Sequence, residues 1–317
     1  MKRQFVGRLQ EGDVINDYFV AARKDLRDTQ SGSKFLGLVF KDKTGEIGGV
    51  LWNNAPAVAK LFELGDVVNV RGTVNTYQDR LQVRVDQVLP LRPEEYDTND
   101  LVDTPEVHHD AIQAFVKTLN TIQNPWLKQL VDAFLNDQKF MEAFMQCAAG
   151  KKWHHASPGG LALHCYEMSR FAEVACELFT KLNRDLLLTG IFLHDIGKIQ
   201  EMSQGLFVDY TTEGKLLGHI EQGARMANAK MDQIDGFPES IRTQVLHLIL
   251  SHHSELALGS PVVPKTLEAI VLAFIDNLDA QANAFGRVID ETRAKGQEWS
   301  EWITMINRQI WAGKIED

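Results

Sequence analysis

The chain has 317 residues, of which 44% are hydrophobic and 24% charged. These are ordinary globular values, so they exclude a disordered, collagen-like or coiled-coil protein, and the length predicts two domains. Three cysteines without a CxxC pair argue against a disulfide framework. The longest uncharged apolar run, residues 186–193, is far shorter than the about 18 residues of a membrane span. Because the first residues also lack a signal-peptide core, we expect a cytoplasmic protein with no membrane partner.

Charge is unevenly distributed along the chain. The net charge of −10 argues against a nucleic-acid partner, because phosphate binding requires Lys and Arg. However, residues 1–92 carry 14 Lys and Arg against 11 Asp and Glu, whereas residues 93–317 carry 19 against 32. A weakly basic first part, net +3, therefore precedes an acidic second part, net −13.

The first part has the two-residue period of β-strands. Strands are expected from residue 14 onward and over residues 34–41, 46–52, 67–77 and 80–88. Between the third and fourth strands, residues 55–64 predict one short helix. Five strands interrupted once by a helix after the third strand are the layout of an OB-fold, a β-barrel that often binds oligonucleotides.

One face of the last two predicted strands is polar and basic. Arg71 and Arg84 could follow the phosphates of a nucleic acid, and Tyr77, Phe35 or Trp52 could stack on bases. A solvated face with aromatic residues in the core explains the same pattern. The domain could also serve as a protein–protein adaptor.

The second part is predicted to be helical. Residues 93–105 combine a proline at each end with acidic residues and no apolar period, so we expect a linker between an OB-fold domain at 1–92 and an all-α domain at 106–317. The fold class is thus a multidomain α+β protein. Helices are expected over residues 106–123, 126–149, 161–182, 185–196, 219–231, 239–253, 265–285 and 297–311.

Histidine and aspartate residues interrupt the apolar faces of five of these helices. The set consists of His164, His194, Asp195, His219, His252, His253 and Asp276. A single buried histidine is most simply a core residue, but seven such residues would each need separate hydrogen-bond partners. Imidazole and carboxylate together suit Mn, Fe, Co, Zn or Ni, and a helical bundle can direct them into one pocket. A buried aspartate also needs a cation or several donors nearby.

These residues carry a family resemblance. His164, the His194–Asp195 pair and Asp276, with HDIGK at 194–198, resemble the HD-domain metal-dependent phosphohydrolases. His219 and His252–His253 are similar to the binuclear branch of that superfamily. The stretches HHASPGGLALH (154–164), LHDIGKIQE (193–201), GKLLGHI (214–220), ILSHHSELALGSPVVPKTLEA (249–269) and IDNLDA (275–280) further resemble the YhaM-type 3'-5' exoribonucleases, which place an OB-fold before the HD domain.

The resemblance implies an activity, a cofactor and a role for each of these residues. The activity is removal of nucleotides from the 3' end of single-stranded RNA, sometimes of DNA, with two divalent metal ions, Mn being expected and Co or Fe the alternatives. His164, His194 and Asp276 would complete one metal site, the other three histidines the second, and Asp195 would bridge them. Lys198 would act as a charge clamp or proton donor for the phosphate.

Weaker assignments and alternatives remain open at this point. Lys152, His154 and His155 could bind substrate phosphates near the entrance of the site, or could be plain loop surface. An HD site would equally suit a hydrolase of free nucleotides or cyclic dinucleotides, with a regulatory front domain. A nucleic-acid-binding scaffold with an inactive metal site is the third candidate. The native metal, the preference for RNA over DNA, and whether a homo-oligomer forms are not determined by these residues.

Overall fold

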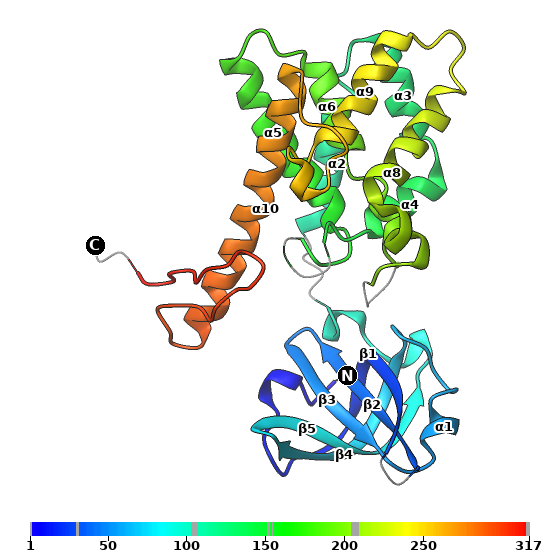
Figure 1. The fold of residues 1–317 in the computed structure, drawn as a ribbon, viewed down its shortest axis with the longest axis vertical. Helices are drawn as coiled ribbons and strands as arrows, with labels where there is room; N and C mark the ends of the chain where they lie inside the picture. Colours follow the sequence, from blue (N-terminus) through cyan, green and yellow to red (C-terminus); the bar gives the residue numbers. More distant parts are fainter. Residues whose placement is uncertain are drawn as a thin grey trace. The chain divides into compact units, whose positions relative to one another are not determined.

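The computed structural model describes residues 2–29, 32–102, 107–150, 153, 155–203 and 209–314, apart from the side chains of residues 107 and 108. The chain divides into two compact units (Figure 1): Ser203 and Asp209 group with the residues up to 105, and the other described residues form the second unit. We call them the barrel unit and the helical unit.

The barrel unit is a closed five-stranded barrel. Its strands are β1 (Val14–Asp28), β2 (Lys34–Asp42), β3 (Gly45–Leu51), β4 (Val67–Tyr77) and β5 (Arg80–Pro90), and a short 3-10 helix, η1 (Val6–Arg8), precedes them. The strand order is β1-β2-β3-β5-β4, and the β3–β5 pair alone is parallel among the pairs described. This order confirms the predicted OB-fold.

The helix between β3 and β4 is shorter than predicted. Instead of spanning residues 55–64, α1 covers only Ala55–Val58. The following backbone hydrogen bonds join Lys60 to Ala57 and Leu61 to Val58, so the chain continues in three-residue turns. These turns direct Phe62 into the barrel, where its side chain is 2% exposed.

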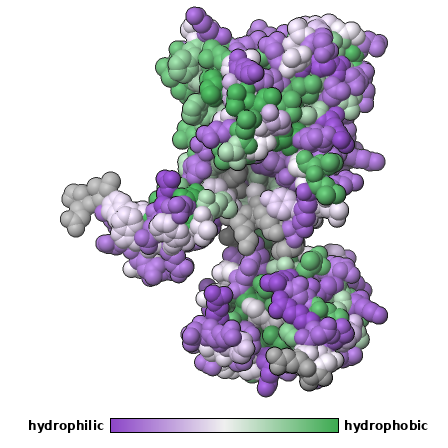
Figure 2. All heavy atoms as spheres, in the orientation of Figure 1, coloured by the Kyte–Doolittle hydropathy of each residue, from purple (hydrophilic) through white to green (hydrophobic). Residues whose placement is uncertain are grey.

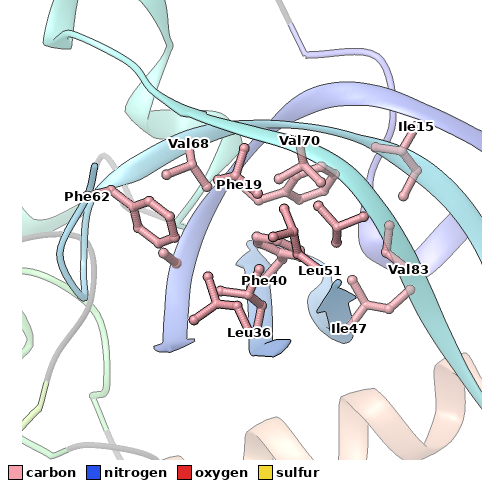
Figure 3. Close-up of a cluster of buried hydrophobic side chains, with 14 of the residues drawn as sticks. Ile15, Phe19, Leu36, Phe40, Ile47, Leu51, Phe62, Val68, Val70 and Val83 are labelled. Atoms are coloured by element: carbon pink, nitrogen blue, oxygen red, sulfur yellow. The ribbon is translucent and has the colours of Figure 1, made fainter. Parts of the chain in front are cut away.

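Alternate residues of all five strands fill the barrel interior, as Figure 3 shows for Phe19, Phe40 and Val70. Each buried side chain of this size contributes about 1.5–3 kcal/mol. A Cβ atom at position 49 would lie 2.7 Å from the Phe40 ring, so Gly49 provides the space that this ring occupies. The apolar alternation seen in the sequence therefore points inward, and the polar residues between point outward.

Residues 93–101 of the predicted linker pack against the barrel. Two short 3-10 helices, η2 (Pro93–Glu95) and η3 (Thr98–Asp100), place Leu101 beside Tyr18, where it is fully buried. The Tyr18 hydroxyl donates to Asp100 Oδ2 at 2.5 Å. The buried leucine, the Tyr18 hydroxyl and hydrogen bonds from Lys2 and Lys43 thus hold this part of the predicted linker against the barrel.

Nine α-helices are described in the helical unit. They are α2 (Val107–Leu119), α3 (Pro125–Leu135), α4 (Gln138–Gln146), α5 (Gly160–Leu178), α6 (Arg184–Leu193), α7 (Lys198–Glu201), α8 (Thr212–Met231), α9 (Glu239–Ser251) and α10 (Leu267–Ala294), with one 3-10 turn, η4 (Leu256–Leu258). The helix predicted over residues 126–149 is in fact two helices. Asp137 breaks it, because its side chain accepts a hydrogen bond from the backbone of Phe140 and so caps the start of α4.

The predicted helix over residues 297–311 is wrong. Instead, α10 continues nine residues beyond its predicted end at 285, and the chain then turns at Gly296, whose φ is +69°. Beyond the turn the chain folds back on itself, with one antiparallel bridge joining Trp299 to Trp311 and another joining Ile303 to Arg308. Ser300 stabilises this arrangement, because its backbone N–H donates to Ile310 O and its hydroxyl accepts from Ile310 N–H, both at 2.9 Å.

Several apolar side chains of the helical unit remain exposed. On α5, Phe171, Val174 and Leu178 are 41%, 55% and 71% exposed, and on α10, which packs against α5, Ile270 and Phe274 are also exposed. Figure 2 shows apolar side chains gathered at the upper left, where the C-terminal half of α5 lies in Figure 1. None of the described helices combines the length and the apolar character that a membrane span requires.

Candidate metal centre

The helical unit brings all seven histidine and aspartate residues of the predicted set together. His164 comes from α5, Asp276 from α10 and His219 from α8, while the two adjacent pairs directly follow the ends of α6 and α9. The donor atoms of His164, His194 and Asp276 lie within 4.8 Å of one another, and so do those of His219, His252 and His253. We call these groups the first triad and the second triad.

Asp195 lies between the two triads. Its Oδ2 atom is 3.3 Å from His194 Nε2 in the first triad. Its Oδ1 atom is 3.4 Å from His219 Nε2 and 3.5 Å from His252 Nε2, both in the second triad. Each carboxylate oxygen therefore faces a different triad, which is the arrangement that a bridging ligand requires.

The histidine rings are held by their Nδ1 atoms. Nδ1 of His194 and Nδ1 of His252 lie 2.9 and 2.7 Å from the carbonyl oxygen three residues earlier in the chain, and Nδ1 of His253 lies 2.9 Å from Leu258 O. Because a carbonyl oxygen only accepts hydrogen bonds, each Nδ1 carries a hydrogen and donates it. In the neutral ring the lone pair is then on Nε2, the atom that faces the other residues of the set.

The pocket contains polar atoms that need a partner. Among the described residues, Nε2 of His194, His219 and His252 and Oδ1 of Asp195 are buried and lack a hydrogen-bond partner. Leaving such atoms unsatisfied costs about 1–3 kcal/mol each, and a divalent cation would satisfy them. Burial lowers the pKa of His252 to about 4, so this ring is neutral at pH 7, as a metal ligand must be. The donor set thus fits divalent cations with nitrogen and oxygen ligands.

The first triad has a different charge state from the second. Burial disfavours a charged His164, but its contacts with Asp276 and Asp279 outweigh burial and raise the pKa of His164 to about 9. His164 Nε2 lies 3.2 Å from Asp276 Oδ1. A cation bound here would therefore take the place of the His164 proton between the ring and Asp276.

Lys198 contacts the centre through Asp195. Its Nζ atom lies 2.5 Å from Asp195 Oδ2 and donates to Ala149 O at 2.6 Å. Burial favours the neutral amine, but the Asp195 carboxylate outweighs this effect and raises the pKa of Lys198. Lys198 therefore provides a fixed positive charge beside the carboxylate that lies between the triads.

Two glycines allow α8 to approach the centre. A Cβ atom at Gly197 would lie 1.9 Å from His219 O, so only glycine lets α8 rest on the turn at residues 194–197. Gly218 has φ +73° and interrupts α8, and the next N–H, that of His219, donates to the Glu201 side chain at 3.0 Å.

Three predicted helix ends differ from the structure at this centre. The helix predicted over 185–196 ends at Leu193, the one predicted over 239–253 ends at Ser251, and the helix expected to begin at His219 begins at Thr212. The pairs His194–Asp195 and His252–His253 therefore lie in turns rather than inside helices. Both His194 and Asp195 are buried at this position.

Three residues of the helical unit, Lys152, His154 and His155, were predicted to bind substrate phosphates. Lys152 and His154 lie outside the described residues. The side chain of His155 is 2% exposed, and its Nε2 atom lies 3.0 Å from Asp279 Oδ2. Its backbone N–H donates to Asn283 Oδ1 at 3.2 Å. His155 is thus held in the interior beside α10.

Arg71, Arg84 and Tyr77 lie on the outer face of the barrel. In the β4–β5 register Arg84 pairs with Thr73, two residues from Arg71, and Tyr77 is 59% exposed. Arg84 also pairs with Val50 of β3, which leads to Trp52. The Trp52 ring is 55% exposed, and its centroid lies 4.9 Å from that of Phe35. Cationic and aromatic side chains therefore share one outer face of the barrel.

Two carboxylates of the centre, those of Glu201 and Asp279, are not in the set of seven ligands predicted from the sequence. Glu201 Oε1 lies 3.0 Å from His219 Nδ1, and Asp279 Oδ2 lies 2.6 Å from His164 Nδ1. Their spacing was a usable signal, because Glu201 follows Lys198 by three residues and Asp279 follows Asp276 by one helical turn.

Comparison with known proteins agrees with both units. A family model described as HD domain matches residues 161–281, and one described as OB-fold nucleic acid binding domain matches residues 20–91. The curated protein 3'-5' exoribonuclease YhaM of Shouchella clausii is 33% identical over 302 residues, which cover 94% of this chain and 92% of that protein. The chain belongs to the YhaM family.

Solved structures resemble parts of this YhaM-family chain. The HD domain of the phosphodiesterase PgpH from L. monocytogenes is 16% identical, with a TM-score of 0.30, over 51% of this chain and 87% of that one. The second OB-fold domain of replication protein A from Methanococcus maripaludis is 24% identical, with a TM-score of 0.24, over 29% and 96%. The YhaM relationship itself confirms the resemblance found in the sequence motifs.

Proposed function

We propose that this chain is a metal-dependent 3'-5' exoribonuclease that hydrolyses single-stranded RNA at a binuclear centre in the helical unit. The observation that carries the proposal is the position of Asp195, with one carboxylate oxygen facing each triad. A curated relative named as a 3'-5' exoribonuclease, matched over 94% of the chain, supports the direction and the substrate class.

The residues divide into ligands and supporting groups. The first triad would hold one cation, the second triad the other, and Asp195 would contact both. Two divalent cations, Mn being expected and Co or Fe the alternatives, would polarise the scissile phosphate and lower the pKa of the attacking water. Lys198 holds Asp195 in place through its ion pair and supplies positive charge, or a proton, to the phosphate oxygens.

A gel assay tests the proposal directly. RNA labelled at its 5' end is incubated with the purified protein and Mn, with and without a chelator, and the products are separated on a denaturing gel. We expect a ladder that shortens progressively from the 3' end and is absent with chelator. Intact RNA together with hydrolysed free nucleotides or cyclic dinucleotides would favour the small-molecule hydrolase instead. If the metal-loaded protein cleaves neither RNA nor free nucleotides, the inactive scaffold is favoured.

The barrel unit is proposed to bind the single strand through its outer face. Replacing Arg71 and Arg84 together by alanine should weaken binding of long RNA about tenfold and lower its salt dependence by about 1.4 in log–log slope, because each contact to single-stranded nucleic acid contributes about 0.7. Binding is measured by fluorescence anisotropy at several salt concentrations. The matched control replaces Lys117 and Lys139, two exposed cations of the helical unit, and removes the same charge. Equal effects of the two double variants would exclude the barrel face as the binding surface.

The remaining expectations concern surroundings and partners. We propose a cytoplasmic protein that acts on RNA, with single-stranded DNA as an alternative substrate in the same gel assay. A homo-oligomer is favoured by the apolar side chains exposed on α5 and α10, since monomers rarely leave such groups of residues uncovered.

A further inference from the structure

Two carboxylates that belong to neither triad each hold one of the histidine ligands. We propose that Asp279 positions His164 for the first cation, that Glu201 positions His219 for the second, and that Glu201 has the larger effect on cation affinity. The inference rests on the two-cation centre of the proposed function and adds the residues that orient its ligands.

Asp279 is placed to fix the orientation of His164. It lies on α10, one turn beyond Asp276, and its Oδ2 atom is 2.6 Å from His164 Nδ1. The same oxygen lies 3.0 Å from His155 Nε2, and the side chain of Asp279 is only 4% exposed. A carboxylate accepting from Nδ1 keeps the hydrogen on that atom and directs Nε2 toward Asp276 and the metal position.

Glu201 is placed to do the same for His219. Its Oε1 atom lies 3.0 Å from both the backbone nitrogen and Nδ1 of His219, so one oxygen accepts two hydrogen bonds from one residue. The position of Glu201 is itself fixed, because its carbonyl oxygen accepts from Thr211 N–H at 2.9 Å. A Cβ atom at Gly214 would lie 2.2 Å from that carbonyl oxygen, so the start of α8 packs directly on Glu201.

The other histidine ligands lack this support. His194, His252 and His253 donate their Nδ1–H groups to backbone carbonyl oxygens. A carboxylate raises the basicity of the ring more than a neutral carbonyl does, because it carries a full negative charge. Each triad therefore contains one histidine that a carboxylate makes a stronger ligand.

The charges of the two triads predict that the carboxylates differ in importance. The first triad includes the negative charge of Asp276, whereas the second triad consists of three histidines. Apart from the shared Asp195, Glu201 is the one carboxylate for which an ion-pair contact to the second triad is described. Removing the charge of Glu201 should therefore lower the affinity for the second cation. This loss should exceed the loss of affinity for the first cation when the charge of Asp279 is removed.

A cobalt titration tests the assignment without relying on catalysis. Metal-free protein is titrated with Co²⁺, and binding is followed by visible absorption and calorimetry, which report ligand geometry and stoichiometry. We expect two binding events in the unaltered chain. His253→Ala and Asp276→Ala serve as references, because each removes a ligand of one triad and so identifies its event.

Glu201→Gln should weaken the event that His253→Ala abolishes, by about 10–100-fold, and leave the other within about threefold. Asp279→Asn should weaken the event that Asp276→Ala abolishes, by a smaller factor in the same range. Glu201→Asp, which restores the charge on a shorter side chain, should recover part of the affinity. Should Glu201→Gln prove unable to fold, Glu201→Asp and Asp279→Asn carry the test, with thermal unfolding of the metal-free proteins as the check.

The matched controls are Glu213→Gln and Asp290→Asn, which neutralise exposed carboxylates on α8 and α10 and should leave both events unchanged. Wild-type affinities in both Glu201→Gln and Asp279→Asn, or equal weakening of both events by either, would overturn the inference. A single Co²⁺ in the unaltered chain would overturn it as well. Uncut RNA from a protein that binds two Co²⁺ would instead contradict the proposed function alone.

Discussion

Asp195→Asn is expected to lower the rate of Mn-dependent RNA cleavage by at least about 100-fold. An amide has one oxygen and one NH₂ group, so the side chain can no longer present an acceptor oxygen both to His194 and to His219. It also removes the negative charge beside Lys198, whose Nζ lies 2.5 Å from the carboxylate. Cleavage is measured by the initial rate of product formation on denaturing gels.

Measuring the affinity for RNA shows whether Asp195→Asn affects catalysis alone or also substrate binding. The affinity of Asp195→Asn for long RNA should stay within about threefold of the unaltered protein, because the proposed binding face lies on the barrel. Asp290→Asn, an exposed aspartate near the end of α10, is the control and should cleave normally. Retention of more than a few per cent of the rate by Asp195→Asn would exclude Asp195 as the bridge between two cations.

Gly197→Ala is expected to lower the free energy of unfolding of the helical unit by about 3 kcal/mol. The added methyl carbon would lie 1.9 Å from His219 O and 2.6 Å from Gly223 N. Both are backbone atoms, so α8 must move as a whole, and His219 moves with it, away from His252 and His253. Thermal or urea unfolding measures the stability, and the cobalt titration should show the second binding event weakened at least about tenfold.

A second glycine provides the control for this substitution. Gly286 lies on α10, and a Cβ atom there would meet nothing within 4 Å. Gly286→Ala should therefore leave activity unchanged and stabilise the chain by up to about 1 kcal/mol, the helix propensity difference between the two residues. An unchanged unfolding midpoint and an unchanged second event in Gly197→Ala would mean that the approach of α8 to this turn is not needed for the centre.

Periodicity predicted the architecture because burial acts on whole strands and helices. The alternation from residue 14 onward yielded all five strands, since every second side chain had to enter one small barrel. Apolar periodicity failed over residues 297–311, because Ser300 and Ile310 join distant parts of that segment in place of helical hydrogen bonds. Such pairing depends on where the end of α10 lies, which local sequence does not encode.

Residue types and motifs predicted the chemistry of the centre. Seven histidines and aspartates on apolar faces, and motifs spread over most of the chain, indicated an HD-type metal site joined to an OB-fold. Residue type sets donor chemistry, so a site for divalent cations could be inferred without coordinates, and the HD assignment followed from the resemblance of the motifs.

How these residues contact one another depends on the packing of the helices. Helix packing places one oxygen of Asp195 toward each triad and buries His155 in the interior. It also brings Glu201 to Nδ1 of His219 and Asp279 to Nδ1 of His164. Apart from the neighbours His194 and Asp195, the residues that these contacts join lie 18 to 124 positions apart in the chain. They depend on contacts between helices, and a local sequence pattern carries no information about the side chain that will lie opposite.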